Sequence, residues 1–303
     1  MADGTDQGAA TALVIGESLV DVLPGGVERP GGSPLNVAVG LARLGHAVEL
    51  ATWFGADDRG LARHLASSGV MIVPGSDAAP RTSSATVSFD EHGSAHYVFD
   101  LLWRVPSLPA GARALVVHAG SIGSMLAPGA RDALAAVRAR RDGATISYDP
   151  NVRPQIVGPV EGARPLAEAF VDAADVVKVS DEDLAWLYPD VEPLASAGAW
   201  AARGPALLVL TRGEHGVLAF TREGVCGRPA PRVAVVDTVG AGDAFLAGLL
   251  HALWTDGLLG ADRRAALAAI DRDTLRACLD VASRVAAITL SRPGADPPWA
   301  AEM

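Results

Sequence analysis

Short apolar runs alternate along the chain with longer Ala- and Leu-rich segments, and this alternation constrains the fold more than any other feature. Six short runs are rich in Val, Ile and Leu: 11–15, 47–53, 114–118, 144–148, 175–179 and 206–210. Five intervening segments carry polar residues at helical spacing: 35–44, 59–67, 128–140, 162–173 and 193–202. The short runs rich in Val, Ile and Leu are typical of buried parallel strands. We therefore expect an α/β fold in which helices cover both faces of a mostly parallel sheet.

One stretch breaks this alternation. The sequences TSSATVSF at 82–89 and SAHYVFDL at 94–101 predict a β-hairpin, with DEHG at 90–93 as its turn. A Gly- and Pro-rich excursion at 24–32 follows the first strand-like run. We expect these pieces to form a small sheet at the edge of the main one. It is either a surface ornament or a lid over a cleft, and residues elsewhere in the chain favour the lid.

Composition limits the kinds of protein that this chain can be. Its 303 residues contain no repeat or linker, so we expect one domain over 11–300, lid segments at about 20–33 and 82–105, and a flexible tail at 1–10. No apolar run reaches membrane-spanning length, and the start lacks the pattern of a signal peptide. A net charge of −10 disfavours nucleic acid. Two cysteines fit a reduced cytoplasm. We expect a cytoplasmic protein without membrane or nucleic-acid partners.

The segment VVDTVGAGDAFLAGLL at 235–250 carries the strongest chemical signal. It reads as the end of a strand, then a glycine-rich turn at 240–242, then an apolar helix. The N-terminus of a helix presents unpaired N–H groups and partial positive charge, which suit a phosphate or a developing oxyanion. Asp243 falls in the first turn beside this anion site. It is either a base for an incoming hydroxyl or an acid that only complements the helix dipole.

A second glycine-rich segment, GGSPLN at 31–36, runs into another predicted helix. We expect Ser33 to cap that helix. Gly31 and Gly32 permit a close backbone approach to a ligand. Asn36 offers a donor and an acceptor, which suit sugar hydroxyls, although local capping is the alternative.

Common nucleotide and nucleophile motifs are absent. The chain has no G-x-x-x-x-G-K-[ST] sequence. The G-x-G-x-x-G pattern fails at Phe245, and G-x-S-x-G fails at Ala119. These absences disfavour a dehydrogenase and an esterase.

The two motifs together, GGSPLNVAVGLARLG at 31–45 and DTVGAGDAF at 237–245, resemble the motif regions of the ribokinase-type, or PfkB, carbohydrate kinases. Three further segments are similar to bacterial fructokinases of that family: GESLVD at 16–21, YDPNVRP at 148–154 and KVSDED at 178–183. The resemblance runs from Gly16 to about Pro297. It implies a ribokinase-like, Rossmann-like αβα sandwich with a β-sheet lid, and transfer of the ATP γ-phosphate to a sugar hydroxyl.

The resemblance also implies a role for individual residues. Asp243 is implied as the base that accepts the hydroxyl proton. The backbone amides of Ala241, Gly242 and Asp243, shaped by Gly240, are implied as the anion hole. The candidate sugar-binding residues are Asp21, Gly31, Gly32, Asn36, Arg153 and Asp243. Arg153 alone suggests a contact to a phosphate or an acidic sugar, with a surface ion pair as the alternative.

The nucleotide is implied to lie near two other segments. TRGEHG at 211–216 resembles the family's T-x-G-x-x-G segment, although a tight turn between strands fits it equally well. At 178–183 the chain has S-x-x-D where many relatives have N-x-x-E near magnesium and phosphate. The candidate ATP-binding residues are Lys178, Ser180, Thr211, Gly213, Gly216 and Gly242, with Asp183 as a candidate Mg²⁺ ligand. Because of that departure, we expect Mg²⁺ to be held largely through water and phosphates.

A monovalent cation is a further candidate cofactor. Asp237 matches the family's cation-linked carboxylate, and SRPGA at 291–295 matches the loop that supplies carbonyl ligands. The resemblance thus makes K⁺ a candidate activator beside ATP and Mg²⁺.

We expect an ATP-dependent sugar kinase, with fructokinase as the leading activity. The alternatives are a 2-keto-3-deoxygluconate kinase, a ribokinase or a nucleoside kinase. From a different class, a non-catalytic sugar or nucleotide sensor on the same scaffold remains open, although the intact Asp243 argues against it. The lid sheet offers a surface for a homodimer. Tyr97, Trp103 and Arg104 either face the sugar or pack the lid against the core.

Overall fold

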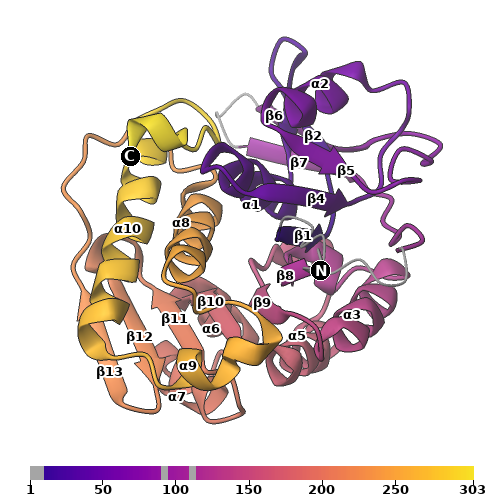
Figure 1. Cartoon of the computed structure of the whole chain (residues 1–303). Coiled ribbons are helices and arrows are strands. Elements are labelled where there is room, and N and C mark those ends of the chain that lie inside the picture. The colour runs from indigo at the N-terminus through magenta and orange to yellow at the C-terminus, as the bar shows by residue number, and fades with distance from the viewer. Residues whose placement is uncertain (1–9, 90–94, 109–113) are drawn as a thin grey trace, which may run out of the picture.

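The computed structural model describes residues 10–89, 95–108 and 114–303, which form two sheets and the helices around them (Figure 1). The expected tail and the hairpin turn at 90–93 lie outside the described residues, except for residue 10. The larger sheet has the strand order β13-β12-β11-β10-β9-β8-β1-β4-β5. Its strands are β1 (Thr11–Ile15), β4 (Ala47–Ala51), β5 (Val70–Ile72), β8 (Ala114–Gly120), β9 (Thr145–Asp149), β10 (Val176–Ser180), β11 (Leu207–Thr211), β12 (Val217–Thr221) and β13 (Gly224–Arg228).

Helices cover both faces of this sheet, which confirms the expected α/β architecture (Figure 1). One face carries α1 (Ser33–Arg43), α2 (Arg59–Ser67), α8 (Ala241–Thr255), α9 (Arg264–Ala268) and α10 (Arg272–Leu290). The other carries α3 (Gly129–Arg140), α5 (Val160–Ala173), α6 (Asp181–Leu187) and α7 (Pro193–Ala201), while the short α4 (Pro154–Val157) follows β9. Helix α8 packs between α1, α10 and the sheet, so it is apolar almost all round.

The predicted small sheet is also present. It contains β2 (Leu19–Leu23), β3 (Val27–Gly31), β6 (Ser83–Phe89) and β7 (Ala95–Asp100), in the order β3-β2-β6-β7. Strands β6 and β7 form the expected antiparallel hairpin, and β2 pairs in parallel with β6. Strand β3 leads through Gly32 directly into α1, so the small sheet is joined to the main fold beside a helix N-terminus.

The strand order of the large sheet reverses at one point. Strand β1 pairs in parallel with β4 on one side and with β8 on the other. From there the chain builds outward through β5 in one direction and through β9, β10 and β11 in the other. A crevice forms outside the carboxyl ends of parallel strands at such a switch point, and it is where ligands bind in open α/β sheets.

Two local expectations are wrong. Residues 235–237 do not form the end of a strand. The N–H groups of Val236 and Asp237 donate to the carbonyl of Leu290, at 2.8 and 3.3 Å, so the C-terminal end of α10 replaces a sheet neighbour. Ser33 does not cap α1, because Gly32 occupies the N-cap position and Ser33 is already inside the helix. The antiparallel strands β12 and β13, not assigned from the sequence, extend the sheet beyond β11.

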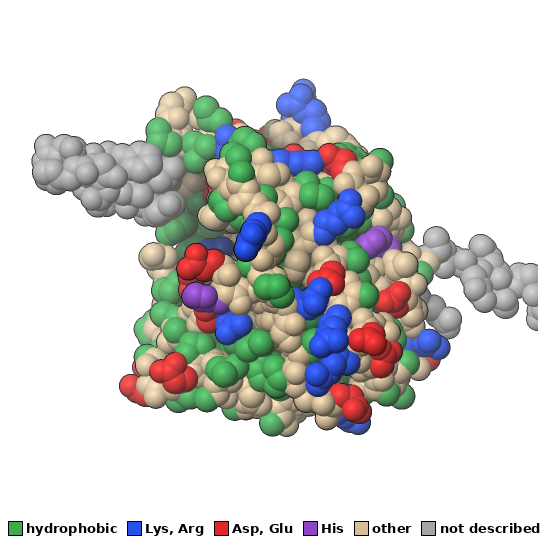
Figure 2. All heavy atoms as spheres, turned by 90° about the vertical axis from the view of Figure 1, so that its left-hand side faces the viewer, with side chains coloured by type: hydrophobic (Ala, Val, Ile, Leu, Met, Phe, Trp, Pro, Cys, Tyr) green, Lys and Arg blue, Asp and Glu red, His purple; other side chains and the backbone are tan. Residues whose placement is uncertain are grey.

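The surface around α10 mixes both signs of charge (Figure 2). One of its ion pairs joins Arg228 to Asp280 at 2.5 Å, with both side chains exposed to solvent by a third or more. Exposed pairs of this kind contribute little to stability. Among the described residues, no helix is both long enough and apolar enough to span a bilayer.

Candidate active site

The glycine-rich turn before α8 forms the expected helix N-terminus. Gly240 has φ of 74°, and a Cβ there would lie 2.5 Å from the Cβ of Ala295, so the turn requires glycine. The N–H of Ala241 donates weakly to the Thr238 carbonyl at 3.3 Å, and the first intrahelical bond runs from Ala244 to Gly240 at 2.8 Å. The intervening N–H groups, of Gly242 and Asp243, therefore lack an acceptor within the helix and can bind an anion.

The carboxylate of Asp243 is fixed by two side chains from α1. Ser33 Oγ donates to Oδ1 at 2.6 Å, and Asn36 Nδ2 donates to Oδ2 at 2.8 Å. Burial raises the pKa of Asp243, while these two hydrogen bonds and the charges of Lys178 and Arg153 oppose the rise. The two glycine-rich motifs, about 200 residues apart in the chain, thus meet at one carboxylate.

The other candidate sugar residues border the same place. Asp21 lies on β2, and Gly31 ends β3 with its Cα close to the Asp21 carboxylate. Gly32 has φ of 106°, and a Cβ there would lie 2.7 Å from a backbone carbonyl oxygen. Arg153 is exposed and donates to Asn151 Oδ1 at 2.8 Å. Its charge lowers the pKa of both Asp21 and Asp243 relative to burial alone, so it lies toward both.

Lys178 lies beneath the first turn of α8. Its Nζ donates to Asp149 Oδ2 at 2.9 Å, and the two side chains are 5% and 0% exposed. A Cβ on Gly242 would lie only 3.0 Å from this ammonium. Burial lowers the pKa of Lys178, but the charges of Asp149, Asp183 and Asp243 outweigh burial and raise it. A permanent positive charge therefore lies directly under the anion site.

Ser180 and Asp183 cap helix α6 reciprocally. Ser180 Oγ accepts from the Asp183 N–H at 3.0 Å, and Asp183 Oδ2 accepts from the Ser180 N–H at 3.1 Å. The other carboxylate oxygen of Asp183 accepts from the Val152 N–H at 2.7 Å. Because both oxygens hold backbone groups, this geometry favours a structural role for Asp183 over direct metal coordination.

The segment at 211–216 forms a tight turn between two strands, which was one of the two alternatives for it. Thr211 ends β11, and Gly216 has φ of 76° and begins the return into β12. The Arg212 N–H closes the turn by donating to the Gly216 carbonyl at 2.9 Å, and Gly213, with φ of 50°, begins the single 3-10 turn inside it. The turn stands at the carboxyl end of β11, on the same edge as Asp149 and Ser180.

Asp237 joins the two loops that the sequence linked to a cation. Its Oδ1 accepts from the Val239 N–H at 3.1 Å, and its Oδ2 accepts from the Gly294 N–H at 2.8 Å. These backbone hydrogen bonds lower the pKa of Asp237. The loop that carries residue 294 is thus held beside the turn that leads into Gly240.

Sequence reasoning missed three groups at this site. Ser33 was expected at a helix cap but instead binds Asp243. Asp149, the partner of Lys178, and Glu17, a fully buried acid, were quoted in motifs without a role. The sequence did mark both acids: Asp149 ends a buried strand and Glu17 comes shortly after one. A charged residue at the carboxyl end of a buried strand is unusual unless it has a function.

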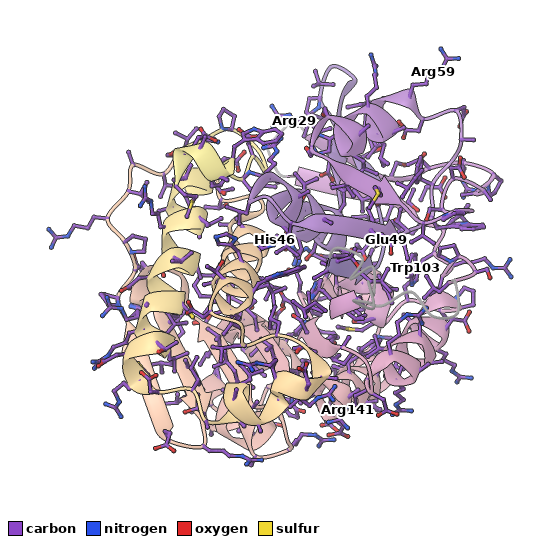
Figure 3. The ribbon with its side chains drawn as sticks, in the orientation of Figure 1. Arg29, His46, Glu49, Arg59, Trp103 and Arg141 are labelled. Atoms are coloured by element: carbon purple, nitrogen blue, oxygen red, sulfur yellow. The ribbon has the colours of Figure 1, made fainter. Side chains whose placement is uncertain are left out.

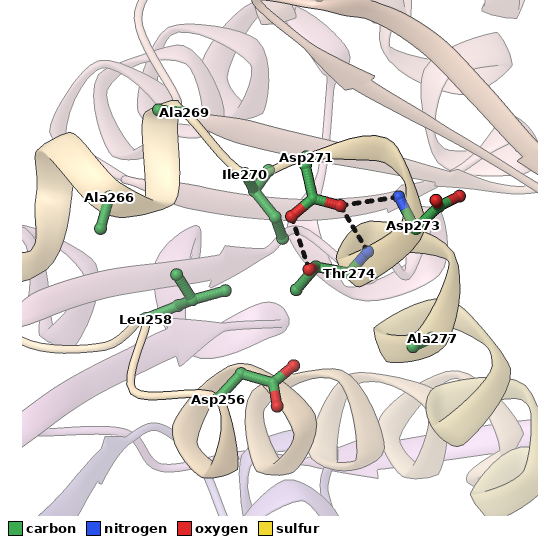
Figure 4. A pocket seen from close by; sticks show the side chains of 9 residues that line it. All are labelled: Asp256, Leu258, Ala266, Ala269, Ile270, Asp271, Asp273, Thr274 and Ala277. Carbon is green, nitrogen blue, oxygen red and sulfur yellow. Dashed lines mark hydrogen bonds between the residues drawn. The ribbon is translucent and has the colours of Figure 1, made fainter.

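A separate hollow of about 630 Å³ lies at the far end of α8 (Figure 4). Its lining residues are Asp256, Leu258, Ala266, Ala269, Ile270, Asp271, Asp273, Thr274 and Ala277. Asp271 accepts hydrogen bonds from the N–H groups of Asp273 and Thr274, both at 2.9 Å, so it caps α10. No motif residue lines this hollow.

Most of the chain is similar to known proteins. Residues 11–302 match the family described as pfkB family carbohydrate kinase. A fructokinase from Klebsiella pneumoniae is 38% identical over 270 residues, covering 84% of this chain and 87% of that protein. The crystal structure of fructokinase with bound ATP from Xylella fastidiosa has a TM-score of 0.81 at 29% identity, covering 94% of this chain and 93% of that one. A fructokinase double mutant from Vibrio cholerae O395, with fructose, ADP and potassium ion bound, has a TM-score of 0.74 at 25% identity, covering 94% of each chain.

The family match spans nearly the whole chain and includes both glycine-rich motifs. They confirm the family inferred from the sequence and the ribokinase-like α/β fold. The chain belongs to the pfkB family of carbohydrate kinases.

Proposed function

We propose that this sugar kinase is a fructokinase, which transfers the γ-phosphate of ATP to a hydroxyl of fructose. The observation that carries the proposal is the carboxylate of Asp243, held between Ser33 and Asn36 beside the N-terminus of α8. The fructokinases among its relatives support the choice of sugar.

In the proposed mechanism, Asp243 accepts the proton of the attacking hydroxyl. Phosphoryl transfer needs alignment and charge neutralisation more than covalent chemistry, and a proton acceptor is required only as the new bond forms. Burial raises the pKa of Asp243 and so makes it a stronger base, while Ser33 and Asn36 hold the plane of its carboxylate. The N–H groups of Gly242 and Asp243, with Ala241 beside them, face the developing charge on the phosphoryl group.

On the sugar side, Asp21, Asn36 and the Gly31–Gly32 backbone bind the hydroxyl groups, and Arg153 adds a positive charge at the mouth. The small sheet, with segments 20–33 and 82–105, acts as a lid on the single kinase domain. Its closure excludes water from the phosphoryl group, so it suppresses ATP hydrolysis without sugar. The junction of β3 with α1 supports this role, because it lies beside Ser33 and Asn36.

On the nucleotide side, Lys178 supplies fixed positive charge under Gly242, and the turn at 211–216 borders the nucleotide. Ser180 acts there through the cap of α6. Three buried acids, Asp149, Asp183 and Asp243, surround the single ammonium of Lys178, so the site favours a further cation. In the described parts of the chain, no group of three or more His, Cys, Asp or Glu side chains could hold a metal by itself. The donor set therefore fits a Mg²⁺ ion that is carried by the nucleotide. Mg²⁺ neutralises phosphate charge when bound. We place a candidate K⁺ site beside the loops joined by Asp237. A potassium ion is bound in the fructokinase double mutant from Vibrio cholerae O395, which makes K⁺ the monovalent cation to test.

Two further properties belong to the proposal. Val27 and Val98, on the two edge strands of the small sheet, are 53% and 65% exposed. Exposed apolar side chains on edge strands favour a homodimer through the lid, which sedimentation analysis can test. A cytoplasmic location, testable by cell fractionation, is favoured because the reaction consumes ATP and because Cys226 and Cys278 are free thiols.

The proposal is tested by measuring ADP release with ATP and Mg²⁺ against fructose, 2-keto-3-deoxygluconate, ribose, glucose, adenosine and inosine, with and without K⁺. We expect the highest kcat/KM with fructose, and phosphorus NMR of the product identifies the phosphorylated hydroxyl. A clear preference for another sugar would replace fructose but keep the kinase. Binding of fructose and ATP without turnover would support the sensor instead.

A further inference from the structure

Glu17 is a buried acid that the proposed mechanism does not use. It follows β1 at the switch point of the large sheet and is 4% exposed. Its Oε2 accepts from the N–H of Gly123 at 2.8 Å, and Gly123 lies in the 3-10 turn η1 (Ile122–Ser124) that follows β8. The carboxyl thus joins the exits of the two strands that flank the reversal. Burying an acid is unfavourable, so such a site needs a reason.

The surrounding backbone is shaped to admit this side chain. A Cβ on Gly123 would lie 2.8 Å from Glu17 Oε2, and a Cβ on Gly32 would lie 2.7 Å from the Glu17 carbonyl oxygen. Ser121, whose hydroxyl also bonds the carboxyl, has φ of 54°, which is unfavourable for a residue other than glycine. Strain of this kind persists where surrounding contacts impose it, and it is frequent at functional sites.

Gly123 continues the connection to the small sheet. Its carbonyl accepts from Trp103 Nε1 at 2.8 Å. Trp103, labelled in Figure 3, lies three residues after β7 and is buried. Its indole packs against Gly129. The preceding Leu102 N–H donates to Ser83 Oγ, at the start of β6, at 2.9 Å. One residue, Gly123, therefore links Glu17 to the base of the hairpin β6–β7.

Glu17 also acts on the reacting end of the site. Burial raises the pKa of Glu17 to about 7, against hydrogen bonds from Ser121 and Gly123, and the charge of Asp243 adds to the rise. The groups that act on its carboxyl are Asp243 from α8, the Ser121 hydroxyl, the N–H of Gly123 and the backbone N–H of Glu17 itself. Glu17 therefore holds its proton to a higher pH than an exposed glutamate does, and it does so beside the carboxyl group of Asp243.

We propose that Glu17 is a positioning residue, which acts through Gly123 and Trp103 to hold the base of the β6–β7 hairpin against the edge of the sheet where Asp243 lies. It thereby sets how the lid seats over the bound sugar. This inference rests on the proposed function, because it assigns the small sheet the role of a lid.

The test compares Glu17→Ala, Glu17→Gln, Trp103→Phe and the double variant Glu17→Ala/Trp103→Phe, using the sugar that the wild-type protein phosphorylates fastest. Trp103→Phe keeps an aromatic ring but removes the indole N–H. We expect Glu17→Ala and Trp103→Phe each to raise the sugar KM by roughly tenfold, with kcat changed less, and to raise ATP hydrolysis without sugar. The double variant should be no worse than Glu17→Ala. Glu17→Gln, whose amide oxygen still accepts from Gly123, should restore the wild-type values.

Two results overturn the proposal: effects of Glu17→Ala and Trp103→Phe that multiply in the double variant, or a loss of kcat with the sugar KM and ATP hydrolysis unchanged. If Glu17→Ala does not fold, the pH profile decides. The wild-type sugar KM should rise above pH 7, where Glu17 loses its proton beside Asp243. The sugar KM of Glu17→Gln should not change over the same pH range. A rise in the sugar KM of Glu17→Gln equal to that of the wild-type protein contradicts the proposal.

A readout without turnover separates this inference from the proposed function. Hydrogen exchange in residues 98–108 should be faster in Trp103→Phe than in the wild-type protein, and unchanged in Glu17→Gln. If no sugar is phosphorylated, the proposed function fails while this comparison still stands. Equal exchange in Trp103→Phe and the wild-type protein overturns the anchoring role.

Discussion

The two ends of helix α8 hold ionisable groups in opposite ways. At the N-terminal end, Asp243 and Lys178 are buried, and hydrogen bonds and opposite charges around each oppose the effect of burial on its pKa. At the C-terminal end, His251 Nδ1 lies 2.8 Å from His46 Nε2, and burial lowers the pKa of both rings, that of His46 to about 4. His46, labelled in Figure 3, also stacks on Trp254.

The difference shows how to recognise the functional end. The hollow near the C-terminal end is lined by acids, such as Asp271 and Asp273, that are exposed to solvent. Burying a charge is expensive unless partners are in place, so buried ionised groups are evidence of selection for chemistry, whereas an acidic hollow is not. The four changes below test this contrast between the two ends.

The largest effect is expected at Asp243. Asp243→Asn should lower kcat by about three orders of magnitude, which is the range for losing a positioned base. The KM for ATP should change by less than a few-fold, and the melting temperature should stay equal or rise, because a buried charge is removed. Steady-state kinetics and calorimetry measure both. Wild-type turnover in this variant would end the assignment of Asp243 as the base.

A second test separates charge from stability at Lys178. Lys178→Met leaves Asp149 buried without its partner, which should destabilise the protein by about 3–5 kcal/mol. Lys178→Met/Asp149→Asn removes both charges and should restore most of that stability. Its turnover should remain low, because the positive charge under Gly242 is still missing. Urea unfolding and kcat give the two readouts, and full recovery of kcat in the double variant contradicts the electrostatic role.

The histidine pair should affect stability but not catalysis. The pKa of His46 is lowered from 6.5 to about 4, so the unfolded chain binds more protons below pH 6.5. Stability is therefore fully present above about pH 6.5 and is lost as the pH falls toward 4. His46→Phe keeps an aromatic ring stacked on Trp254. It should reduce the loss of stability at low pH by about 1 kcal/mol, which is less than the full pKa shift implies because solvent screens the half-buried His46 ring. Urea unfolding at pH 7 and pH 5 checks this, with kcat at pH 7 as the control.

The smallest effect on activity is expected at the hollow. Asp271→Ala removes the N-cap of α10, so the melting temperature should fall slightly. The kcat and both KM values should stay within twofold of the wild-type values, because the hollow lies at the other end of α8 from Asp243. Asp273→Asn, which leaves the cap intact, is the matched control. A large loss of kcat in either variant would mean that the two ends are coupled.

Much of the fold was predictable because it depends on local patterns. All six expected strands and all five expected helices occur within about two residues of their predicted bounds. The strand expected at 235 failed because its hydrogen-bond partner, the carbonyl of Leu290, is far away in sequence. Strands β12 and β13 were missed because a short antiparallel extension carries no alternation with helices to mark it.

In the candidate site, too, residues fixed by local patterns were predictable and residues fixed by distant contacts were not. Gly240 and Gly32 were identified from the sequence because a positive φ at a tight turn strongly favours glycine. Ser33 was assigned to a cap because that is the usual local role of serine before a helix. Its hydrogen bond to Asp243 crosses 210 residues, and no local pattern announces it.

The sequence by itself determined the layered α/β architecture, the glycine-rich turn before α8 and the family, because periodicity and turn chemistry are written in neighbouring residues. Only the tertiary structure decided which buried groups face one another: Ser33 and Asn36 with Asp243, Lys178 with Asp149, and Glu17 with Gly123. These contacts follow from how the strands are ordered and where α1 and α8 meet. The protonation of each acid depends on its burial and partners, so it could be assigned only after the chain was folded.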